Sequence, residues 1–344
     1  MQRACLVAAA AAAVAAAPTI APVPTLLLSG VTNGTVTIPR ILLGTGGGNG
    51  GFDVLAWIEA GGAGFDTAQT YCYFTSPKRD GVPAAACSQV AIANALSVAG
   101  VDPRSYFIIS KIEPEDFGEL DVWSGFGRAF DRGILQEMST PVLDVIMFHQ
   151  AGRGESAGNV RPACFNASAA GPAGPGAYAA CRLATFSAML DLVRRGAARA
   201  AAVSNWQVRD LQQAFDATGT FPSALEVEVH PWWHEDALLD FCLANNITII
   251  AYAPVGLATA AHLADPAVAA VAAAHPGMTP AQVLLRWALQ RTRGVVIPRS
   301  ANATHMKENL GVFAAAMALT DAEMARLATL PQKKIFNVYC QPWC

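Results

Sequence analysis

Four side chains that can move protons follow three neighbouring apolar runs of the chain. Asp66 and Tyr71 belong to the string GFDTAQTY, Lys111 follows FIIS, and His149 follows VIMF. Short apolar runs are typical of buried strands, and parallel strands bring the residues at their carboxyl ends to one face. An ammonium group beside a phenol favours the phenolate, so we expect Lys111 to lower the pKa of Tyr71, while Asp66 keeps the lysine charged. The cluster predicts proton transfer.

Each of these residues alone has an ordinary structural interpretation, as half of an ion pair or as a core histidine with satisfied hydrogen bonds. Four of them at consecutive strand ends favour a reactive site instead. Lysine is also scarce, with five copies in 344 residues, so Lys111 at a strand end is not an accident of composition.

The composition and charge of the chain exclude several classes of binding partner. The chain is 53% hydrophobic and 14% charged, against about 25% charged in an average domain, which excludes intrinsic disorder. Its 23 basic and 26 acidic residues give a net charge of −3 and form no block of like charge. Neither nucleic acid nor an anionic membrane surface is therefore an expected partner. We expect a monomer that binds a small, roughly neutral molecule.

A repeating unit of apolar run, turn and helical pattern would position these residues. The apolar runs lie at 41–43, 63–65, 106–110, 143–148, 200–203, 225–229, 248–252 and 295–298. The helical patterns lie at 52–60, 88–99, 123–138, 182–195, 208–218, 235–245, 280–290 and 304–312. These alternations predict an α/β fold, a (β/α)8 TIM barrel that forms one domain over residues 25–344.

Two additions to the barrel are expected. Residues 25–28 and 35–38 flank Asn33-Gly34, which signals a hairpin that could close one end of the barrel. Thr320 and Glu323 form a capping box that opens a helix to about residue 330, so we expect one or two extra C-terminal helices.

The glycine-rich string GTGGGNGG supports a competing fold. Gly46, Gly48 and Gly51 satisfy the G-x-G-x-x-G pattern, and Asp66 follows about 20 residues later, as in a dinucleotide-binding Rossmann domain. That fold leaves the residues at the later strand ends without a role, so the barrel is the preferred interpretation.

Residues 1–17 are interpreted as a signal peptide. Arg3 precedes an apolar run over residues 4–17 that is too short to span a bilayer and ends in three alanines suited to cleavage. This predicts localisation to the secretory pathway or the extracellular space, without stable membrane insertion after cleavage. A disordered leader or a transit peptide, and hence a cytoplasmic or organellar protein, is the alternative.

The cysteines agree with an oxidising compartment. Six of them form pairs close in sequence: Cys72 with Cys87, Cys164 with Cys181, and Cys340 with Cys344. We expect the first two pairs to form disulfide bonds across loops at the mouth of the barrel, and Cys242 to be a buried thiol. The sequons that suggest a glycoprotein are Asn33, Asn166, Asn246 and Asn302. Reduced cysteines in a cytosolic protein are the alternative.

Seven motifs, between about residue 35 and residue 330, follow the order found in a known family. They are GFDTAQTY at 64–71, SKI at 110–112, LDVIMFH at 143–149, VSNW at 203–206, EVHP at 228–231, AYAPVG at 251–256, and TPAQVLLRWALQ with VIPRS between 279 and 300. With these motifs the chain resembles the aldo-keto reductase family, as a secretory-type or algal- or protist-like member with extra cysteine-bracketed loops.

The resemblance implies NADPH-dependent reduction of an aldehyde or ketone to an alcohol by reversible hydride transfer. It implies Tyr71 as the general acid, Lys111 and Asp66 as residues that adjust its acidity, and His149 as the residue that orients the carbonyl oxygen.

The resemblance also implies a cofactor site. Its residues are Ser204, Asn205 and Glu226 at the nicotinamide carboxamide, Tyr252 beneath the nicotinamide ring, Arg299 with Ser300 and then His305 at the phosphates, and Glu308 and Asn309 at the adenine. Glu226 stands where the family has Gln, and as a carboxylate it accepts but cannot donate a hydrogen bond. Arg299 replaces a usual Lys and His305 a common Arg. Neutral imidazole holds a phosphate dianion weakly, so NADH is allowed as a cofactor beside NADPH.

Around the substrate the chain departs further from the family. Gln150 replaces a frequent Trp and Glu113 a frequent aromatic residue, so the mouth is expected to be polar. His230 and His234 in HPWWH have the spacing of a zinc pair, but no third ligand is close in sequence and the family shares the E-x-H-P pattern. We expect no metal site.

Two other function classes stay open. Glu226 and His305 fit a catalytically impaired barrel that acts as a nucleotide-binding or regulatory module. A secreted structural or glycan-binding barrel without cofactor is the other alternative, since NADPH is scarce outside reducing compartments.

Overall fold

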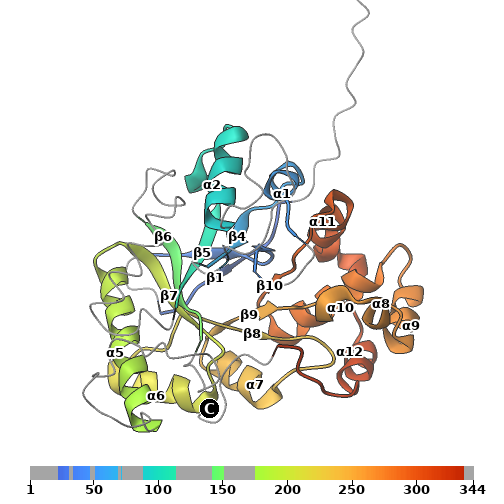
Figure 1. Ribbon diagram of the computed structural model, residues 1–344. Helices are drawn as coiled ribbons and strands as arrows, with labels where there is room; N and C mark the ends of the chain where they lie inside the picture. Colours follow the sequence, from blue (N-terminus) through green and yellow to red (C-terminus); the bar gives the residue numbers. More distant parts are fainter. Residues whose placement is uncertain are drawn as a thin grey trace, which may run out of the picture.

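The computed structural model describes residues 22–30, 34–46, 51–68, 71, 88–113, 142–150 and 175–336. Parallel strands form the centre of this part of the molecule (Figure 1), and each pairs with the next along the chain. They are β3 (Leu43–Gly44), β4 (Gly64–Asp66), β5 (Phe107–Ile112), β6 (Leu143–Phe148), β7 (Ala198–Ser204), β8 (Ala224–Glu228), β9 (Thr248–Tyr252) and β10 (Val295–Ile297).

The sheet closes on itself. Ile41 forms a parallel bridge with Val296, and the Leu42 N–H donates to the Val296 carbonyl oxygen at 3.1 Å, so the first strand lies beside the last. The predicted (β/α)8 barrel is confirmed. The Rossmann alternative is wrong, because an open doubly wound sheet reverses its strand order and does not close.

Side chains along each strand alternate between two hydrophobic clusters. In β5, Phe107 and Ile109 belong to the cluster inside the barrel, whereas Ile108 and Ile112 belong to the cluster shared with the helices. Both faces of each strand are therefore buried, and this burial is the reason that the strands appear in the sequence as nearly continuous apolar runs.

A hairpin closes the end of the barrel where the strands begin. β1 (Thr25–Leu27) pairs antiparallel with β2 (Thr37–Pro39), as predicted. The hairpin lies at the amino ends of the strands, since Arg40, just before β3, donates its N–H to the Pro24 carbonyl oxygen at 2.8 Å. Leu28, Val36 and Ile38 join the interior cluster. The carboxyl ends of the strands are left as the mouth.

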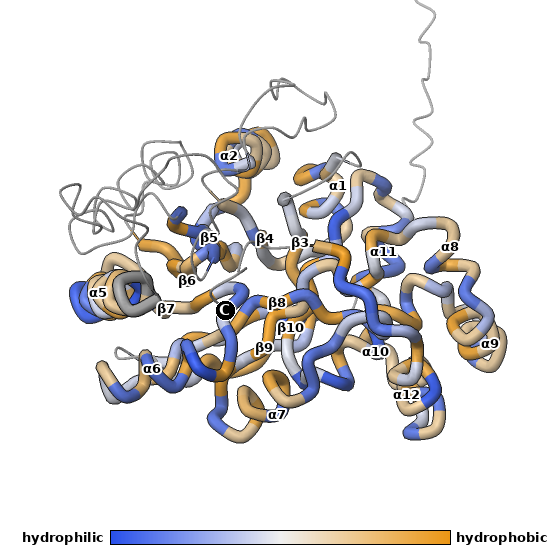
Figure 2. The backbone as a smooth tube through the Cα atoms, turned by 60° about the horizontal axis from the view of Figure 1, so that its bottom comes forward, coloured by the Kyte–Doolittle hydropathy of each residue, from blue (hydrophilic) through white to orange (hydrophobic). Residues whose placement is uncertain are grey.

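Helices cover the outside of the barrel (Figure 1). They are α1 (Val54–Glu59), α2 (Ser88–Val98), α5 (Pro175–Arg194), α6 (Val208–Thr218), α7 (Asp236–Ala244), α8 (Ala260–Leu263), α9 (Pro266–Ala274), α10 (Pro280–Thr292), α11 (Ala303–Leu310) and α12 (Asp321–Ala328). Short 3-10 turns lie at Pro103–Ser105, Gly256–Ala258, Gly311–Phe313 and Ala315–Met317. In Figure 2, α6 and α12 alternate between hydrophilic and hydrophobic segments, because one side of each helix packs on the core.

One helix predicted outside the repeating units is confirmed, and two other helices were not predicted. α12 begins at the predicted capping box, in which Thr320 and Glu323 satisfy each other's backbone. α8 and α9 were not predicted from the sequence, although Asp265 caps α9 and Pro266 occupies its first turn. An alanine-rich stretch shows no alternation of apolar and polar residues, so periodicity alone did not reveal it.

Several expected features lie outside the described residues. They are the signal peptide at 1–17, the helical pattern at 123–138, Cys72, Cys87, Cys164, Cys340 and Cys344, and the sequons at Asn33 and Asn166. Within the described ranges, no helix combines the length and the apolar character that crossing a lipid bilayer would require.

Candidate active site

A buried ion pair stands at the centre of the mouth. Asp66 ends β4, and Lys111 is the fifth residue of β5. Lys111 Nζ lies 2.5 Å from Asp66 Oδ1 and 3.3 Å from the Thr67 carbonyl oxygen, and both charged residues are buried. Burial alone would lower the pKa of Lys111, but the carboxylates of Asp66 and Glu226 outweigh it and raise that pKa above its usual value. Lys111 is therefore a fixed cation.

Tyr71 and His149 complete the predicted group of four. The Tyr71 hydroxyl lies 3.3 Å from His149 Nε2, and Lys111 Nζ lies 5.1 Å from the centre of the phenol ring. The two aromatic rings meet edge to face, at 5.4 Å between centroids. The structure thus brings together Asp66, Tyr71, Lys111 and His149, as the sequence predicted. This is an arrangement that can deliver a proton.

The predicted acidity of Tyr71 is wrong. Lys111 does lower the pKa of this phenol, but burial of the hydroxyl is the larger effect and raises it. The carboxylates of Asp66, Glu226 and Glu113 raise it further, so the pKa of Tyr71 lies above its ordinary value. In the protein alone the phenol keeps its proton. Tyr71 is therefore a hydrogen-bond donor that releases its proton only to a strong base such as a developing alkoxide.

Glu113 is a member of the cluster that sequence reasoning treated only as a polar substitution. Its Oε1 lies 2.8 Å from His149 Nδ1, on the side of the ring opposite the Tyr71 contact. The strand register could have revealed this contact, because Ile112 of β5 pairs with Phe148 of β6 and the two residues that follow are Glu113 and His149.

A second group of side chains lies beside the first. Asn205 Nδ2 donates to Ser204 Oγ at 2.9 Å and to the His149 carbonyl oxygen at 3.2 Å, and the Tyr252 hydroxyl donates to Asn205 Oδ1 at 2.9 Å. Asn205 has φ of 61°, a left-handed conformation that asparagine tolerates better than most residues. The predicted contacts for a nicotinamide carboxamide are therefore grouped next to His149.

Glu226 links the two groups. Its Oε1 lies 3.5 Å from Lys111 Nζ, while its Oε2 is buried without a hydrogen-bond partner among the described residues. Burial, then the charge of Asp66, raise the pKa of Glu226 well above its usual value, although Lys111 opposes this. A raised pKa widens the pH range in which Glu226 keeps its proton, and a protonated carboxyl group donates one hydrogen bond.

The expected phosphate and adenine residues occupy a separate part of the mouth, on α11 and the loop before it. Arg299 Nη1 donates to the Gly46 carbonyl oxygen at 3.2 Å, and the Ser300 carbonyl oxygen accepts from the Asp53 N–H at 3.3 Å. On α11, His305 is exposed, Glu308 half-buried and Asn309 buried. The residues predicted from the sequence thus form two sets at the mouth of the barrel. One set holds the proton-transfer and carboxamide residues, and the other holds the phosphate and adenine residues.

Gly46 connects the glycine-rich string to Tyr71. A Cβ atom at this position would lie 2.4 Å from the Tyr71 ring, so any side chain would displace the phenol. The glycine therefore provides close packing against Tyr71, and its carbonyl oxygen is the one that Arg299 holds. Asp66, which the Rossmann interpretation would assign to a ribose, is bound to Lys111 instead.

The loop after β9 contains a strained segment that the sequence analysis missed. Ala253, Gly256, Leu257 and Ala258 all have positive φ, and Leu257 is exposed. Left-handed non-glycine residues are costly and occur at functional loops. Within this turn the N–H groups of Gly256 and Ala258 donate to the carbonyl oxygens of Ala253 and Val255, each at 2.9 Å. Gly256 in the AYAPVG motif was the available signal.

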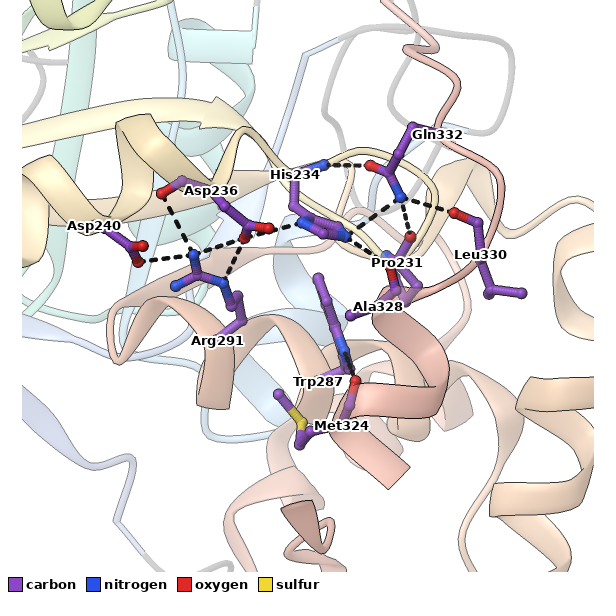
Figure 3. A network of polar contacts seen from close by, with 10 residues as sticks. All are labelled: Pro231, His234, Asp236, Asp240, Trp287, Arg291, Met324, Ala328, Leu330 and Gln332. Carbon is purple, nitrogen blue, oxygen red and sulfur yellow. Dashed lines mark hydrogen bonds and ion pairs between the residues drawn. The ribbon is translucent and has the colours of Figure 1, made fainter. Parts of the chain in front are cut away.

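The chain beyond α12 returns to the mouth along a polar network (Figure 3). Gln332 Nε2 donates to the Pro231 carbonyl oxygen at 3.0 Å and Gln332 Oε1 accepts from the His234 N–H at 3.1 Å. Farther along, the N–H groups of Ile335 and Phe336 donate to the Glu228 carboxylate at 2.6 and 2.9 Å. The segment 331–336 is therefore fixed beside the end of β8.

This segment lies against Tyr252, the residue expected beneath the nicotinamide ring. Phe336 meets Tyr252 edge to face, at 5.8 Å between ring centroids. The two histidines of HPWWH lie beneath it with different partners: His230 Nε2 lies 3.0 Å from Glu228, and His234 Nδ1 lies 3.0 Å from Asp236. Within the described part of the chain, no three metal-binding side chains converge.

Residues 53–331 match the Aldo/keto reductase family. The chain belongs to the aldo-keto reductase family. The general activity of this family is oxidoreduction, which agrees with a proton-transfer cluster at the mouth of a barrel. The motifs that suggested the family in the sequence supply Asp66, Tyr71, Lys111, His149, Ser204, Asn205, Tyr252, Arg299 and Ser300.

Individual relatives cover different shares of this aldo-keto reductase. An aldo-keto reductase of Mycolicibacterium smegmatis is 27% identical over 310 residues, 89% of this chain and 90% of that protein. Aldo-keto reductase family 1 member A1 of Bos taurus is 35% identical over 137 residues, 38% of this chain and 42% of the bovine protein. That match spans less than half of the bovine enzyme.

Solved structures share the fold. The aldose reductase from Schistosoma japonicum superposes with a TM-score of 0.68 and 24% identity, covering 91% of this chain and 97% of that one. The D53A mutant of Gox0644, solved in complex with NADPH, superposes with a TM-score of 0.67 and 23% identity, covering 90% of this chain and 94% of that one.

Proposed function

We propose that this aldo-keto reductase reduces an aldehyde or a ketone to an alcohol with NADPH. The observation that carries the proposal is the meeting of the Tyr71 hydroxyl with His149 Nε2 at 3.3 Å, next to the Lys111–Asp66 pair. These residues lie at the carboxyl ends of β4, β5 and β6, where a barrel enzyme places its chemistry.

The residues present fit NADPH. Ser204, Asn205 and the unsatisfied Oε2 of Glu226 offer donors and acceptors for a carboxamide, and Tyr252 offers a ring surface beside them. Arg299, whose Nη1 lies 3.2 Å from the Gly46 carbonyl oxygen, offers a cation to the phosphates. The cofactor supplies the hydride. Because His305 is a weaker cation than arginine, NADH is proposed as a second cofactor.

The chain's own residues then handle the oxygen and its proton. Tyr71 donates a hydrogen bond to the carbonyl oxygen and gives up its proton as negative charge develops there. Lys111, held by Asp66, stabilises the phenolate that is left. His149 orients the same oxygen from the other side. The substrate is a small molecule, and we propose that the protein acts as a monomer.

Replacement of the acid is the direct test. Tyr71→Phe should lower aldehyde reduction at least about a hundredfold, because proton transfer typically contributes that much. Cofactor affinity, read from quenching of intrinsic fluorescence by NADPH, should stay the same. Tyr106→Phe is the matched control, since Tyr106 stacks on Phe65 away from the cluster. More than about a tenth of the activity in Tyr71→Phe would mean that another group is the acid.

A catalytically impaired nucleotide-binding or regulatory module is the second candidate. Its supporting observations are the buried carboxyl of Glu226 and the exposed His305 at positions expected to hold the cofactor. This candidate predicts binding of NADPH without turnover of any generic aldehyde. Turnover by the unmodified protein would exclude it.

We also propose that the protein matures in the secretory pathway after removal of residues 1–17. The sequence-local pairs of cysteines support the proposal, and Cys242, which has no such partner, is a buried free thiol. The proposed pairs are Cys164 with Cys181 and Cys72 with Cys87. Asn246 and Asn302 are exposed and thus accessible to glycosylation, although Asn302 also caps α11 at the adenosine end of the site.

A further inference from the structure

We propose that Glu113 is a positioning residue of the active site. Its carboxylate holds the Nδ1–H of His149, aims Nε2 at the Tyr71 hydroxyl, and lets the imidazole return protons from solvent to the phenol. The inference rests on the proposed reductase function and adds a third group to the proton path.

Two contacts on opposite sides of one ring carry the inference. Glu113 Oε1 lies 2.8 Å from His149 Nδ1, and the Tyr71 hydroxyl lies 3.3 Å from His149 Nε2. A carboxylate accepts but does not donate, so the Nδ1 nitrogen must carry a proton. The Nε2 nitrogen is therefore the one that gains and loses the exchanging proton.

The backbone of His149 is fixed in both directions. Its N–H donates to the Ile112 carbonyl oxygen at 3.1 Å, and its carbonyl oxygen accepts from Asn205 Nδ2 at 3.2 Å. The Glu113 side chain is 8% exposed and the His149 side chain 15% exposed. The pair is thus shielded enough for a strong charge-assisted contact, and the imidazole keeps an edge through which protons exchange with water.

The charges around the pair define what Glu113 contributes. Among the described residues, Lys111 places a positive charge near the pair, and Asp66 adds a carboxylate beside that of Glu113 itself. Tyr71, Tyr252 and Glu226 are the other titratable groups nearby, and burial raises the pKa of each. Glu113 is the carboxylate that contacts the imidazole directly. Since burial raises the pKa of Tyr71, a phenolate formed in the reaction must regain its proton promptly, and the adjacent imidazolium can supply it.

The proton balance is complete. During reduction the carbonyl carbon receives the hydride, and the Tyr71 O–H bond breaks as its proton moves to the carbonyl oxygen. His149 Nε2–H then protonates the phenolate and leaves a neutral imidazole that still donates Nδ1–H to Glu113. Water returns one proton to Nε2. Alcohol oxidation runs through the same steps in reverse.

The kinetic test is Glu113→Gln, which keeps an oxygen acceptor for Nδ1–H but removes the charge. The pH at which kcat/KM for aldehyde reduction falls to half should move down by about one unit or more, because an opposite charge at this distance shifts a pKa by that amount. NADPH affinity should not change. Glu323→Gln is the matched control, since Glu323 lies 3.0 Å from His275 Nε2 outside the site.

Failure of the proposed reductase function and failure of the proposed role of Glu113 give different results. No turnover by the unmodified protein would overturn the proposed function, whereas turnover with an unshifted pH profile in Glu113→Gln would overturn the role of Glu113. Nitrogen NMR of the imidazoles gives a readout independent of activity. The chain has six histidines, and the signals lost in His149→Asn identify the relevant ring. We expect the Nδ1–H tautomer and a lower titration midpoint in Glu113→Gln. An Nε2–H tautomer or an unchanged midpoint would overturn the inference.

Discussion

At the scale of single residues, one ammonium group is shared by two carboxyl groups. Lys111 Nζ lies 2.5 Å from Asp66 Oδ1 and 3.5 Å from Glu226 Oε1. The cation can balance one negative charge in this dry site, and the closer carboxylate is the one it balances. Glu226 therefore keeps its proton at pH values where an exposed glutamate has lost it, and it resembles glutamine in being able to donate.

Glu226→Gln should stabilise the protein increasingly as pH rises. The pKa of Glu226 in the folded state lies above its ordinary 4.5, so above that pH the unfolded chain releases a proton that the folded chain retains. Folding of the unmodified protein loses up to about 1.4 kcal/mol per pH unit from this group until the folded pKa is passed, and the variant does not. Urea unfolding at pH 5 and pH 8 measures the difference. An equal difference at both pH values would contradict the raised pKa.

His305→Arg should strengthen the preference for NADPH over NADH. His305 lies in the first turn of α11, exposed, where a permanent cation could reach a 2′-phosphate. A charge-assisted contact contributes about 1.5 kcal/mol, so the ratio of the two dissociation constants should change roughly tenfold. Fluorescence titration with both cofactors gives the ratio. Thr304→Arg adds the same charge one residue away, and an equal effect there would show that position 305 makes no specific contact.

At the scale of elements, residues distant in sequence meet because parallel strands end together. The pairing of Ile112 with Phe148 brings Glu113 next to His149, and the pairing of Ser204 with Glu226 brings the carboxamide residues together. The last segment of the chain is held differently, by hydrogen bonds between side chains and backbone groups. Glu228 at the end of β8 and Gln332 carry most of that attachment.

Gln332→Ala should loosen the segment 331–336. The substitution removes donation to the Pro231 and Leu330 carbonyl oxygens, at 3.0 and 2.8 Å, and acceptance from the His234 N–H. The amides of Ile335 and Phe336 should then exchange with solvent several-fold faster, which hydrogen-exchange mass spectrometry measures. Gln332→Glu keeps an oxygen that accepts from the His234 N–H. Its exchange rates should therefore lie between those of the unmodified protein and those of Gln332→Ala. Unchanged exchange in Gln332→Ala would show that Glu228 alone holds the segment.

At the scale of the whole molecule, the sequence predicted the barrel because burial on both faces leaves a direct trace. Strands such as Leu143–Phe148 and Thr248–Tyr252 were predicted with their observed bounds. The cluster of Asp66, Tyr71, Lys111 and His149 was predicted because these residues follow such strands. The pKa of Tyr71 was mispredicted because it depends on burial and on three carboxylates from other elements, which local sequence does not display. The left-handed turn after β9 was missed because backbone conformation at Leu257 and Ala258 has no signature in residue type.

The cysteines test how the whole chain matures. Cys242 lies on the buried face of α7, where burial raises the pKa of its thiol to about 12, so it should resist alkylation until the protein unfolds. Cys181 should be recovered only in a cross-linked peptide unless a reductant is added. If its partner is Cys164, reduction opens a loop of about 15 residues and should destabilise the protein by roughly 3 kcal/mol. Non-reducing peptide mapping of protein from its native source shows whether Cys181 is cross-linked, and N-terminal sequencing shows whether residues 1–17 are retained. Cys242→Ala should leave the cross-linked peptide unchanged. Free Cys181 in a protein that retains residues 1–17 would contradict secretory maturation and favour a reductase of a reducing compartment.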